Sequence, residues 1–345
     1  MERERIYTRM NSRFVLFRAC IFTTLLLIAS AFTAAQTQQP DSQDIDVVRV
    51  STSLVTVPIS VMDRNGRFVP DLTQRQFHLF ENGVEQDVAF FENAQKPFTV
   101  ALLLDVSDSA KFKFNEIQNA AIAFVAQLRP DDRVLVAVFD KRVTIMCEAT
   151  NDRHLLESAI RRVRSGGGTS LYDAVDMIVT QRLNKIRGRK ALVLFTDGVD
   201  TTSAGATYES TLHAAQELDA LAYSIKYNTM DDVSESSREI DAGQRNSLDL
   251  RTAKGEKLSV AYERADRYLR LLADKSGGRF FYAASPKHLE EIFSRIAQEL
   301  REQYSLGYYP KNRDTSVSQR SIKIKVDAPG AVVRARRNYL YKSDN

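Results

Sequence analysis

Apolar positions follow a repeating pattern through the middle of this 345-residue chain. Five short runs are apolar at nearly every position, as expected of strands buried on both faces of a parallel sheet. They are Phe98–Leu104, Arg133–Phe139, Lys190–Thr196, Leu221–Tyr227 and Arg279–Ala283. Stretches with apolar residues at helical spacing separate these runs. This alternation predicts a doubly wound α/β domain, with a mostly parallel sheet and helices on both faces.

Three helical stripes are clear between the first three runs. They extend from Ile117 to Leu128, from Leu155 to Val163 and from Tyr172 to Val179. Further helices are expected around 208–220, 261–275 and 286–303. The segment 229–257 is polar and has no sustained apolar stripe, so we predict a long surface insertion there.

The segments on either side of the α/β region have the composition of strands. Residues 46–96 contain a β-type run at 54–61 and a hairpin signal, Phe77–Glu81 and Val84–Phe91 around Asn82-Gly83, a turn pair that tolerates positive φ. Residues 304–345 contain three more runs, Tyr304–Tyr309, Ser321–Val326 and Val332–Arg336. We hypothesise that both segments join in one small β module, with the α/β domain at 97–303 inserted between them.

The first 35 residues are similar to a secretory signal peptide. A basic region ends at Arg18, an apolar core runs from Ala19 to Phe32, and small residues follow at 33–35. The core is shorter than the roughly 20 residues of a membrane-spanning helix. We therefore expect a secreted or periplasmic protein, with an uncleaved membrane anchor as the alternative. Residues 36–45 are polar and contain proline, which is typical of a linker.

The charge of the chain gives no indication of a polyanionic partner. The formal net charge is +4, and residues 1–35 contribute five arginines and two glutamates, so the remainder carries +1. We therefore expect no nucleic-acid binding. Arg334, Arg336 and Arg337 form a small basic cluster, interpreted as a solvated strand face, with contact to an anionic glycan or lipid as the alternative. Cys147 is predicted to be a buried core thiol.

Five oxygen-bearing side chains lie just after predicted strands or a glycine turn. They are Asp105, Ser107 and Ser109 in LLLDVSDSA, Thr169 in SGGGTSLYDA and Asp197 in LVLFTDG. Ligands of open α/β sheets collect beyond the carboxyl ends of the strands, so these side chains can meet at one point. Carboxylates and hydroxyls are hard ligands that suit Mg²⁺ or Mn²⁺, and no His or Cys favours zinc. We predict a Mg²⁺ site, with Mn²⁺ and Ca²⁺ left open.

These residues resemble the metal-ion-dependent adhesion site of the von Willebrand factor A (VWA) domain. Its Asp-x-Ser-x-Ser, Thr and Asp pattern is matched by Asp105-Val106-Ser107-Asp108-Ser109, Thr169 and Asp197. The flanking β segments look like those of bacterial secreted VWFA-related proteins. The resemblance implies a six-stranded sheet with one antiparallel edge strand. It also implies Mg²⁺ held by Ser107, Ser109 and Thr169, with Asp105 and Asp197 acting directly or through water. A partner protein's Asp or Glu would complete the coordination.

Signatures of enzymes are missing from the sequence. It has no Gly-x-Ser-x-Gly elbow, and no Gly-Lys-Ser/Thr follows Gly166–Gly168 as a nucleotide loop would require. Asp105 sits where an aspartyl-phosphate phosphatase has its nucleophile, but Ser107 replaces the second aspartate of that pattern. We predict a non-enzymatic adhesion or scaffold protein that binds a partner through the cation. The alternative is an envelope-assembly module in which the ion only staples loops.

Overall fold

The computed structural model describes residues 54–93, 96–108, 114–227, 252, 255–312, 314 and 319–341. The predicted signal segment, the predicted linker and most of the predicted insertion at 229–257 lie outside these residues. Among the residues that the structure describes, no helix combines the length and the apolar character needed to cross a membrane.

A six-stranded sheet forms the centre of the α/β region, with strand order β10-β9-β8-β5-β6-β7. The strands are β5 (Thr99–Asp105), β6 (Arg133–Phe139), β7 (Val143–Thr150), β8 (Lys190–Thr196), β9 (Leu221–Tyr227) and β10 (Arg279–Ala283). All neighbours are parallel except β7, which pairs antiparallel with β6 at one edge. Every residue of β5 and β8 is buried, which explains their continuous apolar runs. The predicted fold class is confirmed.

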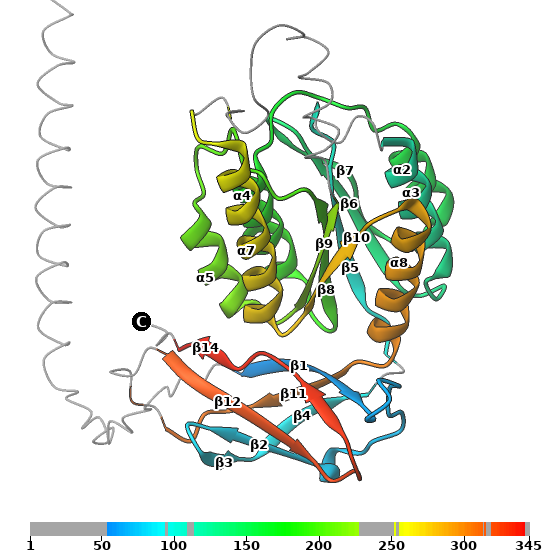
Figure 1. The fold of residues 1–345 in the computed structure, drawn as a ribbon. Coiled ribbons are helices and arrows are strands. Elements are labelled where there is room, and N and C mark those ends of the chain that lie inside the picture. The colour runs from blue at the N-terminus through cyan, green and yellow to red at the C-terminus, as the bar shows by residue number, and fades with distance from the viewer. Residues whose placement is uncertain are drawn as a thin grey trace, which may run out of the picture. The chain divides into compact units, whose positions relative to one another are not determined.

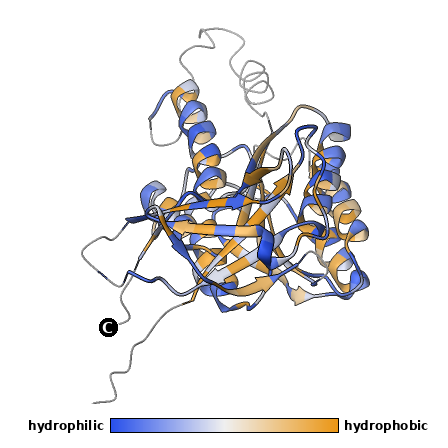
Figure 2. Ribbon diagram, turned by 90° about the horizontal axis from the view of Figure 1, so that it is seen from below, coloured by the Kyte–Doolittle hydropathy of each residue, from blue (hydrophilic) through white to orange (hydrophobic). Residues whose placement is uncertain are grey.

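Helices cover both faces of this sheet (Figure 1). One face packs against α2 (Phe114–Gln127), α3 (Arg153–Arg161) and α8 (Pro286–Arg301). The other packs against α4 (Leu171–Asp176), α5 (Tyr208–Glu217) and α7 (Leu258–Ser276). Neighbouring residues of β5 point to opposite faces, so Leu102 joins the first core and Leu103 the second. Hydrophobic and hydrophilic residues alternate along the helices, as Figure 2 shows.

Two local features of the α/β region differ from the prediction. The third helical stripe ends as an α-helix at Asp176 and continues as the π-helical segment η3 (Met177–Arg182) and the 3-10 turn η4 (Leu183–Lys185). Cys147 is only partly buried, because it lies on the edge strand β7, although it packs against the core. Burial raises the pKa of its thiol.

Strands from both ends of the described chain share two further sheets. One has the order β13-β1-β11-β4 and the other β14-β12-β2-β3. The first contains β1 (Val55–Met62), β4 (Val88–Glu92), β11 (Tyr304–Tyr308) and β13 (Val332–Arg334). The second contains β2 (Phe77–Glu81), β3 (Val84–Gln86), β12 (Gln319–Val326) and β14 (Asn338–Leu340), and the short 3-10 turn η1 (Gln74–Gln76) precedes β2. Their inward-facing residues, including Ile59, Leu79 and Tyr304, form one core.

The predicted hairpin forms only in part. Asn82 and Gly83 have φ of 47° and 82°, the left-handed conformation of a two-residue hairpin turn, and they connect β2 to β3. The predicted second arm, however, is divided at Asp87. Its first half pairs with β2, and its second half, β4, pairs with β11 in the other sheet. The chain therefore changes sheets within one apolar run, which periodicity alone does not indicate.

The predicted basic strand face at 334–337 is wrong for two of its three arginines. Arg336 is buried, and its guanidinium donates to the backbone carbonyls of Gln216 and Leu218 at the end of α5, and to Thr56 at 2.7 Å. Arg334 pairs with Glu299 of α8. Carbonyl groups at a helix C-terminus have no partner within the helix, and the Arg336 guanidinium supplies one.

Candidate metal centre

Asp105 is the last residue of β5, a strand in the middle of the sheet, and it is fully buried. Its Oδ1 accepts a hydrogen bond from the backbone N–H of Ser107 at 3.0 Å. Its Oδ2 accepts one from the hydroxyl of Thr196 at 2.5 Å. The contact with Ser107 turns the chain from strand to loop and places a second buried oxygen, the Ser107 hydroxyl, beside the carboxylate.

Asp197 directly follows β8, the parallel neighbour of β5, and it is also buried. Its Oδ1 accepts a hydrogen bond from the backbone N–H of Val199 at 3.0 Å. Gly198 has a φ of 85°, and a Cβ there would lie 2.9 Å from Cδ1 of Leu269 on α7. Glycine is therefore required immediately after Asp197, both for the backbone conformation and for the close approach of α7.

The two carboxyl groups influence each other electrostatically. Burial, followed by the negative charge of Asp197, raises the pKa of Asp105 to about 7, against smaller opposing effects of hydrogen bonds from Ser107 and Thr196. Two buried carboxylates at one point are unfavourable by themselves, and a divalent cation would offset both charges. The donor set of this edge therefore fits a hard cation.

Thr169 is held between the loops that follow β5 and β8. The loop before it is attached to the β5 loop through Gly166, whose N–H donates to the carbonyl of Val106 at 2.8 Å. On the other side, the carbonyl of Thr169 accepts hydrogen bonds from the N–H groups of Thr201 and Thr202. The N–H of Thr169 donates to the Thr201 hydroxyl at 2.8 Å. Backbone contacts thus fix Thr169, which is nearly fully buried, at the same edge.

The glycines before Thr169 allow close packing against the loop that follows β6. A Cβ at Gly166 would lie 1.9 Å from Oδ2 of Asp140, and a Cβ at Gly168, where φ is 75°, would lie 2.7 Å from Cγ of Lys141. A larger residue at either position would have to displace the side chain of Asp140 or Lys141, and at Gly168 it would also be strained by the positive φ. The glycine run therefore lets the loop before Thr169 pack closely against the loop that follows β6.

Four of the five predicted ligands lie at a strand end or in loops that these hydrogen bonds connect: Asp105, Ser107, Thr169 and Asp197. The fifth, Ser109, lies outside the described residues. Within the described ranges, no group of three or more His, Cys, Asp or Glu side chains is arranged to hold a metal ion. Any cation at this edge would therefore need the serine and threonine hydroxyls beside the two carboxylates.

Several supporting residues were not found from the sequence. Thr196 donates to Asp105 and accepts from the N–H of Gly198 at 2.9 Å, so it connects the two acidic positions. Asp173 accepts three backbone N–H groups from residues 204–206, which lower its pKa although burial opposes this, and which fix the loop after Asp197. The only signal in the sequence is their closeness to predicted ligands. Thr196 directly precedes Asp197, and Asp173 follows Thr169 by four positions.

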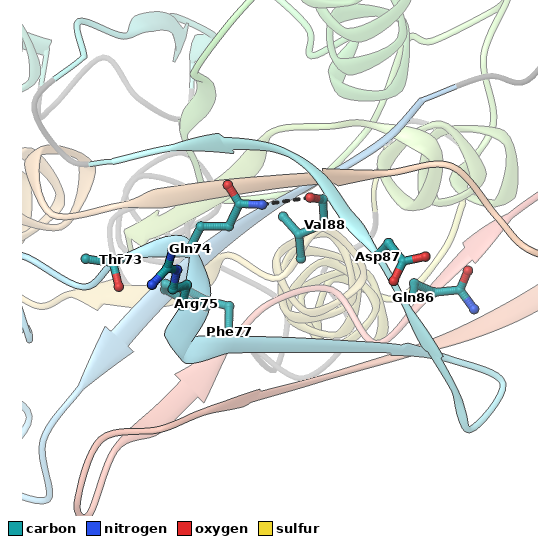
Figure 3. Close-up of a pocket in the computed structure, with 7 residues that line it drawn as sticks. All are labelled: Thr73, Gln74, Arg75, Phe77, Gln86, Asp87 and Val88. Atoms are coloured by element: carbon teal, nitrogen blue, oxygen red, sulfur yellow. Dashed lines mark hydrogen bonds between the residues drawn. The ribbon is translucent and has the colours of Figure 1, made fainter.

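A separate hollow of about 780 Å³ lies on the β sheets and is lined by Thr73, Gln74, Arg75, Phe77, Gln86, Asp87 and Val88. The Gln74 side chain reaches across it and donates to the carbonyl of Val88 at 2.7 Å (Figure 3). One arginine and one aspartate are its charged lining residues. This surface offers no convergent set of ligands comparable to the edge that contains Asp105.

The raised pKa of Asp105 predicts how the stability of the metal-free protein depends on pH. The folded protein retains a proton on Asp105 that the unfolded chain releases above about pH 4. The free energy of unfolding should therefore fall as the pH rises from about 4 to about 7. Thermal unfolding in EDTA across this range measures it. Asp105→Asn, which cannot ionise, should flatten the profile, and an unchanged slope in this variant would contradict the assignment.

Comparison with protein families finds one match, which covers the residues of this edge. Residues 100–199 match the family model of the von Willebrand factor type A domain. The matched stretch begins in β5 and ends after β8, and it contains all five predicted ligands. This part of the chain is therefore similar to a von Willebrand factor type A domain. A search of curated protein sequences found no match.

Solved structures with a similar fold are distant in sequence. A von Willebrand factor type A protein from Catenulispora acidiphila is 11% identical, with a TM-score of 0.44, over 86% of this chain and 76% of that one. The vWF domain of the type V pili tip protein Mfa5 from Porphyromonas gingivalis is 14% identical, with a TM-score of 0.42, over 59% and 94%. Proximal thread matrix protein 1 from the mussel byssus, with a zinc-occupied MIDAS motif, is 14% identical, with a TM-score of 0.44, over 64% and 49%.

Proposed function

We propose that the VWA domain of this chain binds a partner protein through a divalent cation, with Mg²⁺ as the expected ion. The observation that supports the proposal most strongly is the pair of buried carboxylates, Asp105 and Asp197, at the carboxyl edge of two adjacent parallel strands. The proposed hydroxyl ligands are neutral and the two carboxylates can act through water, so the ion would remain electron-poor and keep a position for an external carboxylate.

Each side chain has a separate role in this proposal. The hydroxyls of Ser107, Ser109 and Thr169 would hold the ion, while Asp105 and Asp197 would contact it directly or through water. An Asp or Glu of the partner would complete its coordination. The ion supplies the electrostatic attraction, and the loops that follow β5 and β8, together with the loop that contains Thr169, supply the surrounding protein surface.

We further propose that the protein is exported from the cytoplasm and that it has no catalytic role. The sequence of residues 1–35 supports export to the periplasm or the outside of the cell, and membrane contact would then arise only if this segment stays uncleaved. No residue is assigned as a catalytic acid, base or nucleophile. The expected partner is a protein rather than a nucleic acid, as the near-neutral charge of residues 36–345 indicates.

Partner binding is tested with Thr169→Ala, which removes one proposed ligand from the candidate metal centre. The purified wild-type protein or the variant is immobilised and incubated with an extract of the source cells, in Mg²⁺ or in EDTA, and the captured proteins are identified. We expect capture by the wild-type protein in Mg²⁺ alone, and a reduction of about tenfold or more with Thr169→Ala. Thr180→Ala, which removes an exposed threonine hydroxyl in η3, should capture as the wild type does.

The same variants distinguish binding from a purely structural ion. If the ion only staples loops, Mg²⁺ should raise the melting temperature of the wild-type protein, because a ligand that binds only the folded state stabilises it. Thr169→Ala would then lose that stabilisation, and capture would be the same in Mg²⁺ and in EDTA. That result would replace the proposed function with the alternative of an assembly module.

A further inference from the structure

Three arginines lie near the amino-terminal ends of the strands of the six-stranded sheet, whereas the candidate metal centre lies at their carboxyl ends. They are Arg279, the first residue of β10, Arg295 of α8 and Arg334, the last residue of β13. Because β10 runs parallel to β9, its first residue lies at the amino-terminal edge. The candidate metal centre lies at the carboxyl edge. We call these three residues the arginine cluster.

Glu299 contacts one member of the arginine cluster and lies one helical turn from another. The guanidinium of Arg334 contacts Oε1 of Glu299 and lies 3.3 Å from the hydroxyl of Ser60. Arg295 precedes Glu299 by four residues on α8, so it lies one turn away on the same side of the helix.

The third member approaches the same place from β10. Nη2 of Arg279 lies 3.7 Å from Sδ of Met62, which is two residues beyond Ser60 on β1. Residues two apart on a strand share a face, so Arg279 and Arg334 reach the same face of β1. Both are close enough to the buried hydroxyl of Tyr223 for their charges to lower its pKa, against a larger increase caused by burial.

Glu299 cannot neutralise the whole arginine cluster. It is fully buried, and its Oε1 already accepts hydrogen bonds from Ser60 and Tyr223 at 3.0 and 2.8 Å. Its single charge offsets one of the three arginines, which leaves two positive charges. Arg279 and Arg295 have no ion pair with any residue in the described part of the chain.

The hydrogen-bond donors of the arginine cluster are poorly satisfied. The contacts of Arg279 within the described residues are the Met62 sulfur, a weak acceptor, and the ring of Phe281 at 5.8 Å. Nε of Arg334 is buried and has no partner in the described structure. Burial and the neighbouring Arg295 lower the pKa of Arg279, as expected when guanidinium groups lie close together without a counter-charge.

The arginine cluster is accessible to a ligand. Arg295 is exposed, Arg279 is half-buried, and 20% of the Arg334 side chain is exposed. Guanidinium groups bind tetrahedral oxyanions through paired N–H donors. A phosphate ester carries about −1.5 to −2 charges at neutral pH, which matches the two uncompensated positive charges. We propose that Arg279, Arg295 and Arg334 form a binding site for the phosphate group of an anionic ligand.

Two sources of phosphate are distinguished by two measurements on the purified full-length chain. Titration calorimetry with inorganic phosphate, at constant ionic strength in chloride, tests a soluble ligand. Co-sedimentation with phosphatidylcholine vesicles that contain phosphatidic acid tests a lipid headgroup. Binding in the first experiment assigns a soluble phosphate, and binding to the vesicles alone assigns a lipid.

Arg295→Ala is the deciding variant, because its side chain is exposed and its loss should leave the fold intact, which thermal unfolding checks. We expect phosphate or vesicle binding to weaken by about tenfold or more. Lys287→Ala removes one positive charge from an exposed position on the same helix and should change binding less than about twofold. The proposal is overturned if neither phosphate form binds, or if Arg295→Ala binds as the wild type does. Neither outcome affects the proposed role of Asp105.

Discussion

Replacing Asp105 by asparagine should lower the affinity for Mg²⁺ by about 100-fold or more. The substitution keeps the size of the side chain, and its one carbonyl oxygen can still accept the hydrogen bond from the Ser107 N–H. At the other position the amide nitrogen would donate to the Thr196 hydroxyl instead of accepting from it. It removes one of the two negative charges that the proposed ion would neutralise. The metal-free variant should be at least as stable as the wild type near pH 7, because a buried carboxylate no longer has to ionise there.

Titration calorimetry with Mg²⁺ and thermal unfolding in EDTA measure these two effects on the same samples. Asp131→Asn is a matched control, since Asp131 is exposed and lies just before β6, at the other edge of the sheet. It should bind Mg²⁺ as the wild type does. If Asp105→Asn also retained wild-type affinity, the carboxylate would not belong to a cation site.

Replacing Arg336 by alanine should lower the free energy of unfolding by about 3 to 5 kcal/mol. The guanidinium is buried and donates to three backbone carbonyls, those of Gln216, Leu218 and Thr56. Two of these belong to the end of α5 and one to β1, so the side chain holds the α/β region to the strand of the N-terminal segment. Its loss leaves buried carbonyl groups without donors.

Urea unfolding of the variant, followed by circular dichroism, measures this change. The neighbouring Arg337 is exposed, and Arg337→Ala should change the free energy of unfolding by less than about 0.5 kcal/mol. Equal stability of the two variants would mean that water satisfies the three carbonyls as well as Arg336 does.

Strands buried on both faces were the most predictable part of the fold. β6, β8 and β9 have the predicted bounds, because burial on two sides demands apolar residues at nearly every position. The edge strand β10 also has the predicted bounds, although most of its residues are only partly buried. The edge strand β7 was missed, since its residues are mostly half-buried and its sequence includes Glu148. A three-residue strand such as β14 carries too few positions for a periodic pattern.

The positions of Asp105 and Asp197 were predictable because the carboxyl ends of parallel strands lie at one edge of the sheet. The contacts that orient them were not, because a hydrogen bond between Thr196 and Asp105 joins residues 91 positions apart and leaves no local pattern. The same reason explains the arginines near the C-terminus. Three closely spaced basic residues suggest a solvated face, whereas Arg336 meets carbonyls more than 100 positions away.

Anomalous diffraction from a crystal grown with Mn²⁺ tests the central claim most directly, because manganese suits the same hard oxygen ligands as magnesium and can be located by its own signal. We predict one manganese peak at the carboxyl edge of β5 and β8, within coordination distance of Ser107 and Thr169. A crystal with manganese in the solution and no peak at this edge, or with Thr169 turned away from the peak, would contradict the account.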